Sequence, residues 1–242
     1  MRYSHRLIRV RSPKVNWAVA ATLITILVGV VVLFGVSNLN IADFGASFLT
    51  SLVRVSVSYV VALGIALTLG FVVVGAGWGE KILLPVLDVL QSFPSFALLP
   101  ILLVYFGRGL ISLSIVLILE MIWPILFAII TNYKGLRSDI FEAAQIFGAT
   151  GSKRWVHVVI PAILPAIVTG SIVAWGEAWE AVIGAEIIVN NGGLGNFFSQ
   201  LDPTSQRGLT LVAITGFLLM LFVINKLIWL PMLESVTRYQ SE

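Results

Sequence analysis

Apolar runs long enough to cross a lipid bilayer recur along this chain and limit what it can fold into. The first, residues 17–36, is a predominantly apolar run of 20 residues, and a helix of about 20 such residues spans the hydrocarbon core. Hydrophobic residues make up 58% of the 242 residues, charged residues make up 11%, and the mean hydropathy is +1.00. The sequence therefore predicts an all-α membrane protein with one transmembrane domain, residues 17–242, and no room for a soluble catalytic domain.

These runs predict about six transmembrane helices. Two other segments are expected to lie outside the spans. Residues 38–51 form a polar connection without Lys or Arg, and residues 80–94, which contain two prolines, are predicted to form an interfacial helix. The predicted spans cover residues 17–36, 53–74, 97–106 with an extension at its start, 110–130, 162–188 and 211–230.

The N-terminal segment, residues 1–16, carries five basic side chains and no acidic one. Together with the first apolar run it could form a cleaved signal peptide. That run is longer than the apolar part of a usual signal peptide, and residues 34–37 make a poor small-x-small cleavage site. We therefore predict a basic cytoplasmic segment followed by an uncleaved membrane anchor.

The distribution of basic residues predicts the orientation of the spans, because cytoplasmic segments carry an excess of Lys and Arg. With both termini inside, eleven of the 15 basic residues lie in cytoplasmic segments, three lie in outer segments, and Lys226 lies in the sixth span. This asymmetry favours cytoplasmic N- and C-termini. Since the basic residues flank membrane spans, we attribute the formal charge of +3 to contacts with membrane lipid and expect no binding of nucleic acid.

Residue types that several kinds of chemistry require are missing from the sequence. The chain has no Cys and two widely separated His, His5 and His157, so it offers neither a thiolate nor a candidate metal cluster. Residues 75–79 are rich in Gly, but no Gly-Lys-Ser/Thr ending follows them, so a phosphate-binding loop is not expected. We therefore predict that the chain is not an enzyme, has no ATP site and binds no cofactor or metal of its own.

A polar segment, residues 139–161, interrupts the apolar runs and is expected to face water. Ser138 or Asp139 can N-cap a short helix in this segment. If Asp139 is the cap, Glu142 lies where the partner residue of a capping box belongs. Gly148 is then placed to end the helix.

A second short helix is expected to start at Thr150 or Ser152 and to end before Pro161. The small side chains of the first helix would let another protein approach its backbone closely, and Phe141 and Phe147 would offer apolar contacts. Such a segment suits docking better than catalysis. Taken residue by residue, it could equally be an ordinary cytoplasmic loop with a capped helix.

The complete spacing of this segment resembles the EAA loop of permease subunits of bacterial ABC importers. The family pattern is Glu-Ala-Ala, three residues, Gly, nine residues and Ile-x-Leu-Pro, and this chain departs from it only by Val158 for Ile and Ile160 for Leu. In such complexes the loop, here residues 135–161, docks on a cytoplasmic ATPase. The resemblance assigns this coupling to Glu142, Ala143, Ala144, Phe147, Gly148, Ile160 and Pro161.

The same resemblance implies a type I ABC importer permease architecture in a bacterial plasma (inner) membrane. It also implies three kinds of partner: a pair of cytoplasmic ABC ATPases that bind ATP and Mg, a second permease copy that completes a homodimer, and an extracytoplasmic solute-binding protein. Residues 84–107 and 175–186 are similar to permeases of the nitrate, sulfonate, taurine and bicarbonate group. This similarity implies a small anion or another small polar solute.

Four acidic residues lie within or at the ends of the predicted spans: Glu120, Glu177, Glu180 and Glu186. A carboxylate there costs at least ~2.5 kcal/mol on insertion scales, so protonation, a watery cavity, a basic partner or a cationic substrate must compensate it. Relatives often carry uncharged residues at the places of Glu177 and Glu180. This departure keeps a cationic or zwitterionic solute open.

One face of the fifth predicted span carries small residues and one acid at helical spacing: Gly170, Ala174, Glu177, Ala181 and Gly184. One hypothesis is that this stripe lines a central pathway. The alternative is a buried helix seam in which the acids bond to neighbouring spans. Under the first hypothesis the pathway residues are Glu120, Gly170, Ala174, Glu177 and Glu180.

Two functions of other classes remain open at this point. A proton-coupled secondary transporter would use Glu120 and Glu177 as proton sites and would need no ATPase, but it leaves the EAA spacing unexplained. A membrane scaffold that transports nothing would leave the intramembrane acids unexplained. The EAA spacing therefore favours the permease of an ABC importer.

Overall fold

The computed structural model describes residues 40–76, 79–201 and 207–241, and every regular element among them is a helix. The predicted first span and the basic segment before it lie outside these residues. The helices are α2 (Ile41–Gly75), α3 (Leu84–Gln91), α4 (Leu99–Phe106), α5 (Leu110–Lys134), α6 (Ser138–Ile146), α7 (Ser152–Arg154), α8 (Ile160–Val189), α9 (Leu194–Gln200), α10 (Arg207–Ile224) and α11 (Leu230–Ser241). Short turns η1 (Gly79–Leu83), η2 (Ser95–Leu98), η3 (Trp155–Val159) and η4 (Asn225–Trp229) connect some of them.

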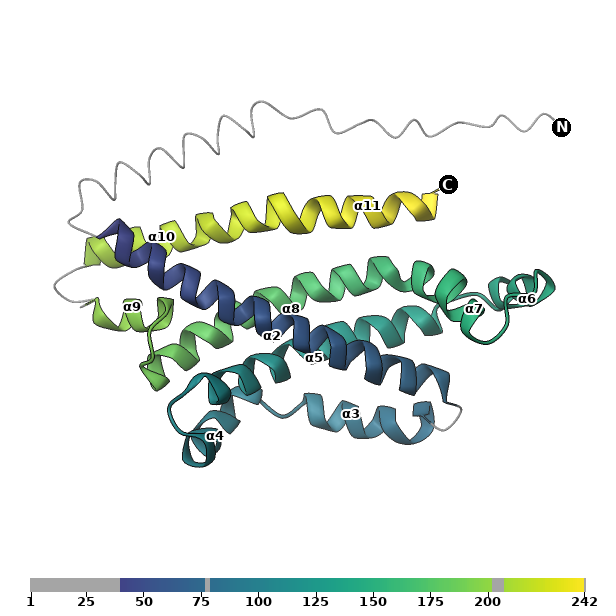
Figure 1. Ribbon diagram of the computed structural model, residues 1–242, viewed down its shortest axis with the longest axis horizontal. Coiled ribbons are helices and arrows are strands. Elements are labelled where there is room, and N and C mark those ends of the chain that lie inside the picture. The colour runs from purple at the N-terminus through teal and green to yellow at the C-terminus, as the bar shows by residue number, and fades with distance from the viewer. Residues whose placement is uncertain (1–39, 77–78, 202–206, 242) are drawn as a thin grey trace, which may run out of the picture.

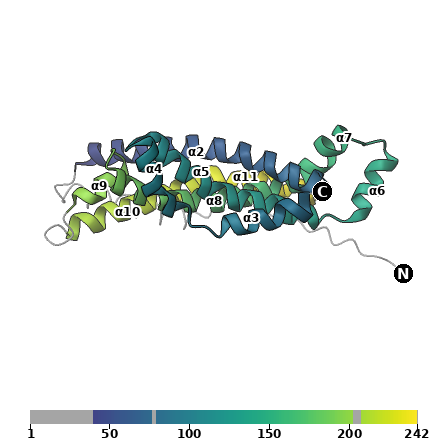
Figure 2. The same cartoon turned by 90° about the horizontal axis from the view of Figure 1, so that it is seen from below.

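The long helices run along the length of an elongated bundle, with α6 and α7 at one end and α9 at the other (Figures 1 and 2). Four helical stretches in the described residues are long and apolar enough to cross a membrane. They contain the predicted second, fourth, fifth and sixth spans. The stretches are Ile41–Gly75, Leu110–Lys134, Ser152–Val189 and Arg207–Thr237.

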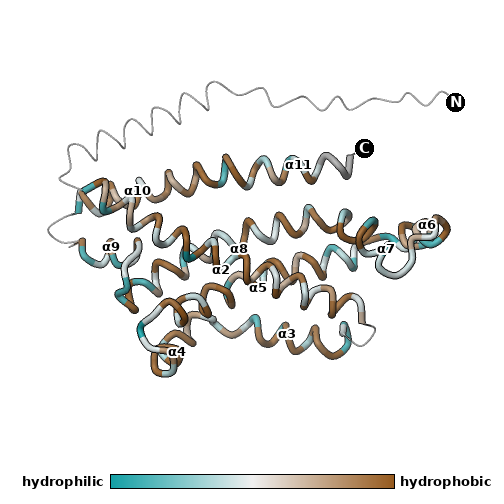
Figure 3. Tube along the Cα trace, in the orientation of Figure 1, coloured by the Kyte–Doolittle hydropathy of each residue, from teal (hydrophilic) through white to brown (hydrophobic). Residues whose placement is uncertain are grey.

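Helix α5 forms the centre of the bundle and packs against α8 and α2. Its buried face is apolar and includes Met121, Ile125 and Ile129, all of them fully buried. Brown, hydrophobic colour recurs along the whole length of the long helices (Figure 3), and large apolar side chains such as Val60 and Leu227 are exposed. Apolar side chains on the outside as well as in the core are what a lipid environment requires.

The predicted third span is not a straight helix. Its first part consists of η1 and α3, and its second part consists of η2 and α4. The axes of the two parts differ in direction by 74°, and Pro94 lies at the break between them. Since α4 has eight residues, it is about 12 Å long and cannot cross a core about 30 Å thick by itself. The bent pair raises the span count of the described residues from four to at most five, so the predicted six spans are not reached there.

Residues 38–51 were predicted to form a polar connection, but the described part of this segment is helical from Ile41 onward. Helix α2 starts at Ile41, because the Asn40 side chain accepts a hydrogen bond from the Ala42 N–H at 3.0 Å and caps the helix. An aromatic contact stabilises the next turns of α2: the Phe48 ring stacks on the Trp179 ring of α8 with a centroid distance of 5.4 Å. The prediction was wrong because this helix start is stabilised by residues distant in sequence.

The polar segment after α5 also differs from its prediction. A helix does begin at Ser152, but it runs through Pro161 to Val189 without a break. Turn η3 is π-helical, and the Ile160 N–H donates to the Trp155 carbonyl five residues earlier. Proline lacks an N–H and its ring crowds the preceding turn, and the wider π turn provides room for it. Turns η1 and η4 precede Pro85 and Pro231 in the same way.

The crossing of α5 and α8 generates a stability prediction. A Cβ at Gly170 would lie 2.8 Å from the Pro124 carbonyl oxygen and 2.8 Å from the Ala128 Cβ, whereas one at Gly176 would meet nothing within 4 Å. We expect Gly170→Ala to lower the stability by about 1–3 kcal/mol through overpacking. Gly176→Ala should be neutral or stabilising, because Ala favours the helix. Melting of the two detergent-purified variants compares them directly, and equal melting would contradict a tight crossing.

Candidate functional site

Helix α6, which contains Glu142-Ala143-Ala144, protrudes from one end of the bundle (Figure 2). As predicted, it ends at Gly148, which has a positive φ of 74°. The Gly148 N–H donates to the Gln145 carbonyl at 3.0 Å, and the Ala149 N–H donates to the Ala144 carbonyl at 2.8 Å. This pair of bonds is a Schellman motif, in which Gly is favoured because it adopts the left-handed conformation without strain.

The start of α6 differs from the prediction. The N-cap position belongs to Arg137, and no side chain caps it; neither Ser138 nor Asp139 takes that role. The Asp139 carboxylate instead accepts from its neighbours, with a distance of 2.8 Å to Arg137 Nη2. This ion pair replaces the predicted capping box, so the structure gives Glu142 no capping function.

The side chains of α6 divide between the bundle and the solvent. Ala144 is buried, whereas Glu142 and Ala143 are exposed. Phe147, predicted as a docking contact, is 87% exposed, and its neighbour Ile146 is 83% exposed. Large apolar side chains this exposed at a protruding tip are typical of an interaction surface. We call Ile146 and Phe147 the apolar tip.

Phe141 was predicted to offer a second apolar contact, but it packs within the chain. Its ring lies under the Arg154 guanidinium, 4.7 Å from ring centroid to Cζ, and beside Tyr133 at 5.9 Å. Trp155 stacks on the other side of this cluster, 5.7 Å from Tyr133 and 5.4 Å from Phe71 of α2. Phe141 and Trp155 therefore fasten the α6–α7 segment to α2 and α5. Beyond Trp155, Ile160 and Pro161 form the first turn of α8.

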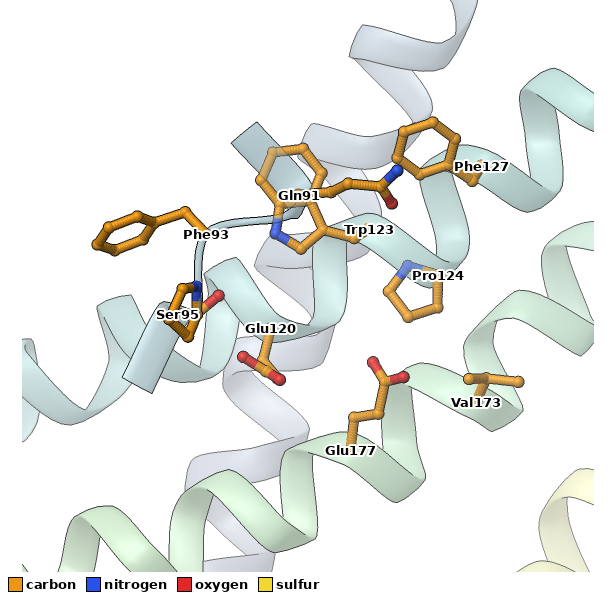
Figure 4. Close-up of a pocket in the computed structure, with 10 residues that line it drawn as sticks. Gln91, Phe93, Ser95, Glu120, Trp123, Pro124, Phe127, Val173 and Glu177 are labelled. Atoms are coloured by element: carbon orange, nitrogen blue, oxygen red, sulfur yellow. The ribbon is translucent and has the colours of Figure 1, made fainter. Parts of the chain in front are cut away.

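A pocket of about 410 Å³ lies between α3, the Pro94 break, α5 and α8. Glu120 of α5 and Glu177 of α8 point into it from opposite sides (Figure 4). Among the described residues, the structure gives neither carboxylate a hydrogen bond or an ion pair, and no cluster there could hold a metal ion. The remaining lining residues are Gln91, Phe93, Pro94, Ser95, Trp123, Pro124, Phe127 and Val173.

The other predicted pathway residues lie elsewhere. Gly170 and Ala174 are buried, and Gly170 lies in the crossing with α5, as the seam alternative expects. Glu180 is exposed and does not line the pocket. The stripe on α8 is therefore divided: its Gly170 part packs against α5, and Glu177 faces the pocket.

A second group of buried charges lies at the other end of the bundle, near α9. Glu186 is fully buried, and its carboxylate lies 2.7 Å from Arg54 Nη1 and 2.8 Å from the Ser51 hydroxyl of α2. The Gly195 N–H donates to the same carboxylate at 2.9 Å, and the Leu194 N–H donates to the Ser51 hydroxyl at 2.8 Å. The Glu186 carboxylate and the Ser51 hydroxyl thus both have partners, as the low dielectric requires.

The loop between α8 and α9 closes over this ion pair. Arg54 donates to the carbonyls of Gly192 at 3.1 Å and Asn191 at 2.5 Å. Gly193 has a φ of 89°, and a Cβ there would collide with the Glu186 carboxylate. Glu186 was expected to need a compensating partner, but the sequence did not identify Arg54 in that role, because the two residues lie 132 positions apart.

Residues 60–230, which include α6 and the pocket, match the family described as "Binding-protein-dependent transport system inner membrane component". The chain belongs to this family. The resemblance to ABC importer permeases that the EAA spacing indicated is thereby confirmed. As a member of this family, the chain is a multi-pass component of the inner membrane.

Individual relatives of this inner membrane component agree with the family. It is 33% identical over 146 residues to a protein of Methanocaldococcus jannaschii described as a candidate ABC transporter permease. It is 29% identical over 153 residues to the nitrate import permease protein NrtB of Synechococcus elongatus, and 28% over 169 residues to the taurine transport system permease protein TauC of Escherichia coli. These matches cover 60%, 63% and 68% of the chain, and 55%, 55% and 59% of the relatives.

The buried ion pair of this transport component generates a second stability prediction. Arg54→Gln would leave the Glu186 carboxylate buried without its cation, and breaking such a pair costs about 3–5 kcal/mol. We expect a large drop in melting temperature of the purified protein. Arg108→Gln, at an exposed position, is the matched control and should melt like the wild type. Adding Glu186→Gln to Arg54→Gln should recover part of the loss; a simply additive double variant would contradict the pairing.

Proposed function

We propose that this chain is the permease subunit of a binding-protein-dependent ABC importer for a small polar solute. The observation that carries the proposal is the placement of Glu142-Ala143-Ala144, the first part of the EAA spacing, on α6, a protruding helix with an exposed apolar tip. Membership of the transport family supports the same function. No rearrangement of the chain is required for a partner to reach α6.

The proposed partners are a pair of cytoplasmic ATPases at the α6 end, a second copy of the chain, and a solute-binding protein at the α9 end. Lys134, Arg137, Lys153 and Arg154 all lie in or next to the α6–α7 segment, and an excess of basic residues is typical of the cytoplasmic side. Lys134 also pairs with Glu80 at 2.7 Å, which places Lys81 near the same end. These positions support a cytoplasmic α6.

Coupling would work through the aromatic cluster that fastens α6. ATP-driven closure of the ATPase pair would move α6, and Phe141 and Trp155 would pass the displacement to α5, α2 and the start of α8. Helices α5 and α8 also form the pocket. A displacement at α6 therefore acts on the two helices that carry Glu120 and Glu177, which is the physical connection that coupling between two sites requires.

Purification of the tagged chain in mild detergent tests this function. We expect an ABC ATPase to copurify in about equal amount and to hydrolyse ATP. Recovery of the intact, folded chain alone, without ATP hydrolysis, would contradict the proposal. It would favour proton-coupled transport through Glu120 and Glu177, the alternative function.

Phe147→Ala tests the apolar tip. Because the side chain is 87% exposed, its removal should leave folding unchanged but reduce the ATPase that copurifies, by about tenfold for a loss near 1.4 kcal/mol of binding free energy. Phe106→Ala, which removes an exposed ring at the opposite end, is the control and should retain the ATPase. Retention of a full amount of ATPase by Phe147→Ala would exclude the apolar tip as the docking contact.

Gly148→Asp tests the end of α6. At a φ of 74° any residue other than Gly is strained, and the change adds a negative charge beside the docking surface. We expect the variant to reach the membrane, and we expect its ATPase partner to hydrolyse ATP without solute uptake. Uptake at the wild-type rate would show that the geometry of this helix end is not needed for coupling.

A further inference from the structure

We propose that the pocket between α3, α5 and α8 recognises the transported solute, and that this solute is a small organic cation: a protonated amine or ammonium group attached to a flat, apolar body. This inference rests on the proposed transport function and adds the chemical class of the solute. It is carried by the position of the pocket, the charges that face it and the rings that line it.

The pocket lies at mid-depth in the membrane-spanning part of the chain. Glu120 is the eleventh residue of α5, about 15 Å along the axis from its start, and Glu177 is twelve residues from the end of α8, about 18 Å from it. The start of α5 and the end of α8 both lie on the α9 side of the bundle (Figure 1). The hydrocarbon core of a bilayer is about 30 Å thick. Measured from those helix ends, both carboxylates therefore lie about half of that thickness into the bundle, at a depth that a solute in transit must pass.

The charges that face the pocket are of one sign. Two carboxylates point into it, and among the described residues no Lys, Arg or His lines it. An anion would be repelled here, whereas a cation placed between Glu120 and Glu177 would relieve their mutual repulsion and gain attraction from both.

The contrast with Glu186 supports a role for the two unpaired acids. Glu186 has Arg54, a hydroxyl and a backbone N–H as partners within the chain, so its charge is already compensated. Glu120 and Glu177 lie farther from the helix ends than Glu186 does, and they have no such partners among the described residues. Intramembrane acids are costly and face a cavity or a substrate when they persist, so the missing positive charge is assigned to the solute.

Three aromatic side chains, Phe93, Trp123 and Phe127, complete the pocket together with Gln91 and Ser95. Aromatic faces attract organic cations, and a Trp ring attracts them more strongly than a Tyr or Phe ring does. Aromatic faces also pack against flat apolar groups. A volume of about 410 Å³ lies within the range of small-molecule sites and fits one ring with an attached ammonium group. The amide of Gln91 and the hydroxyl of Ser95 can orient polar substituents.

Two probes that differ in charge test the inference. Benzylamine is a cation at neutral pH, and benzoate is an anion with the same ring. Binding of each is measured by equilibrium dialysis against the purified full-length chain together with the proteins that copurify with it. We expect benzylamine to bind and benzoate not to bind. Equal or tighter binding of benzoate, or no binding of benzylamine, would overturn the proposal without the need for any variant.

Variants then locate the site. Glu120→Gln and Glu177→Gln should each weaken benzylamine binding about tenfold or more, and Trp123→Leu should weaken it severalfold. Glu180→Gln is the matched control, because that residue is exposed and lies outside the pocket; it should change binding by less than about threefold. Unchanged binding in Glu120→Gln and Glu177→Gln, with normal gel-filtration profiles, would refute the pocket as the site.

The same preparation separates this inference from the proposed function. An active ATPase that copurifies with a chain unable to bind benzylamine leaves the importer function standing and refutes the cationic solute. A chain without an ATPase that still binds benzylamine through Glu120 and Glu177 refutes the importer function and supports the cation site.

Discussion

The close crossing of α5 and α8 is the contact on which the rest of the structure depends. Gly170 allows the two helices to approach until the Pro124 carbonyl occupies the space of a side chain. Because α6 and α7 connect these same helices, their crossing links the protruding tip at one end to the pocket between them. A looser crossing would separate Glu120 from Glu177 and would let the tip move without affecting the pocket.

The acidic side chains within this bundle have two different kinds of surroundings. At the α9 end, Glu186 and Arg54 neutralise each other and hold the loop of Gly192 and Gly193 over the end of α8. In the pocket, Glu120 and Glu177 have no such partner among the described residues. The first arrangement stabilises the fold, and the second leaves attraction available for a ligand. This difference distinguishes structural from functional acids more clearly than their positions in the sequence do.

Much of this organisation could be predicted from the sequence. Hydropathy located the four spans that the described residues contain, Gly148 indicated the end of the short helix, and the EAA spacing indicated the family. The predictions failed where distant residues decide the local structure. Aromatic contacts with other helices stabilise the first turns of α2 after Asn40. The third span is bent at Pro94. The helix that begins at Ser152 continues past Pro161 because a π turn precedes the proline.

The sequence by itself determined that the chain is helical and built for a membrane, since only helices with internal backbone bonds can carry such long apolar runs through lipid. It also determined which segment is polar and available to a partner. The tertiary structure alone decided which acids meet. Helical periodicity places Glu177, Glu180 and Glu186 on α8, but packing against α5 and α2 turns one to the pocket, leaves one exposed and pairs one with Arg54. The physical reason is that a charge is satisfied by whatever lies across the helix interface, and the sequence of one helix does not specify its neighbour.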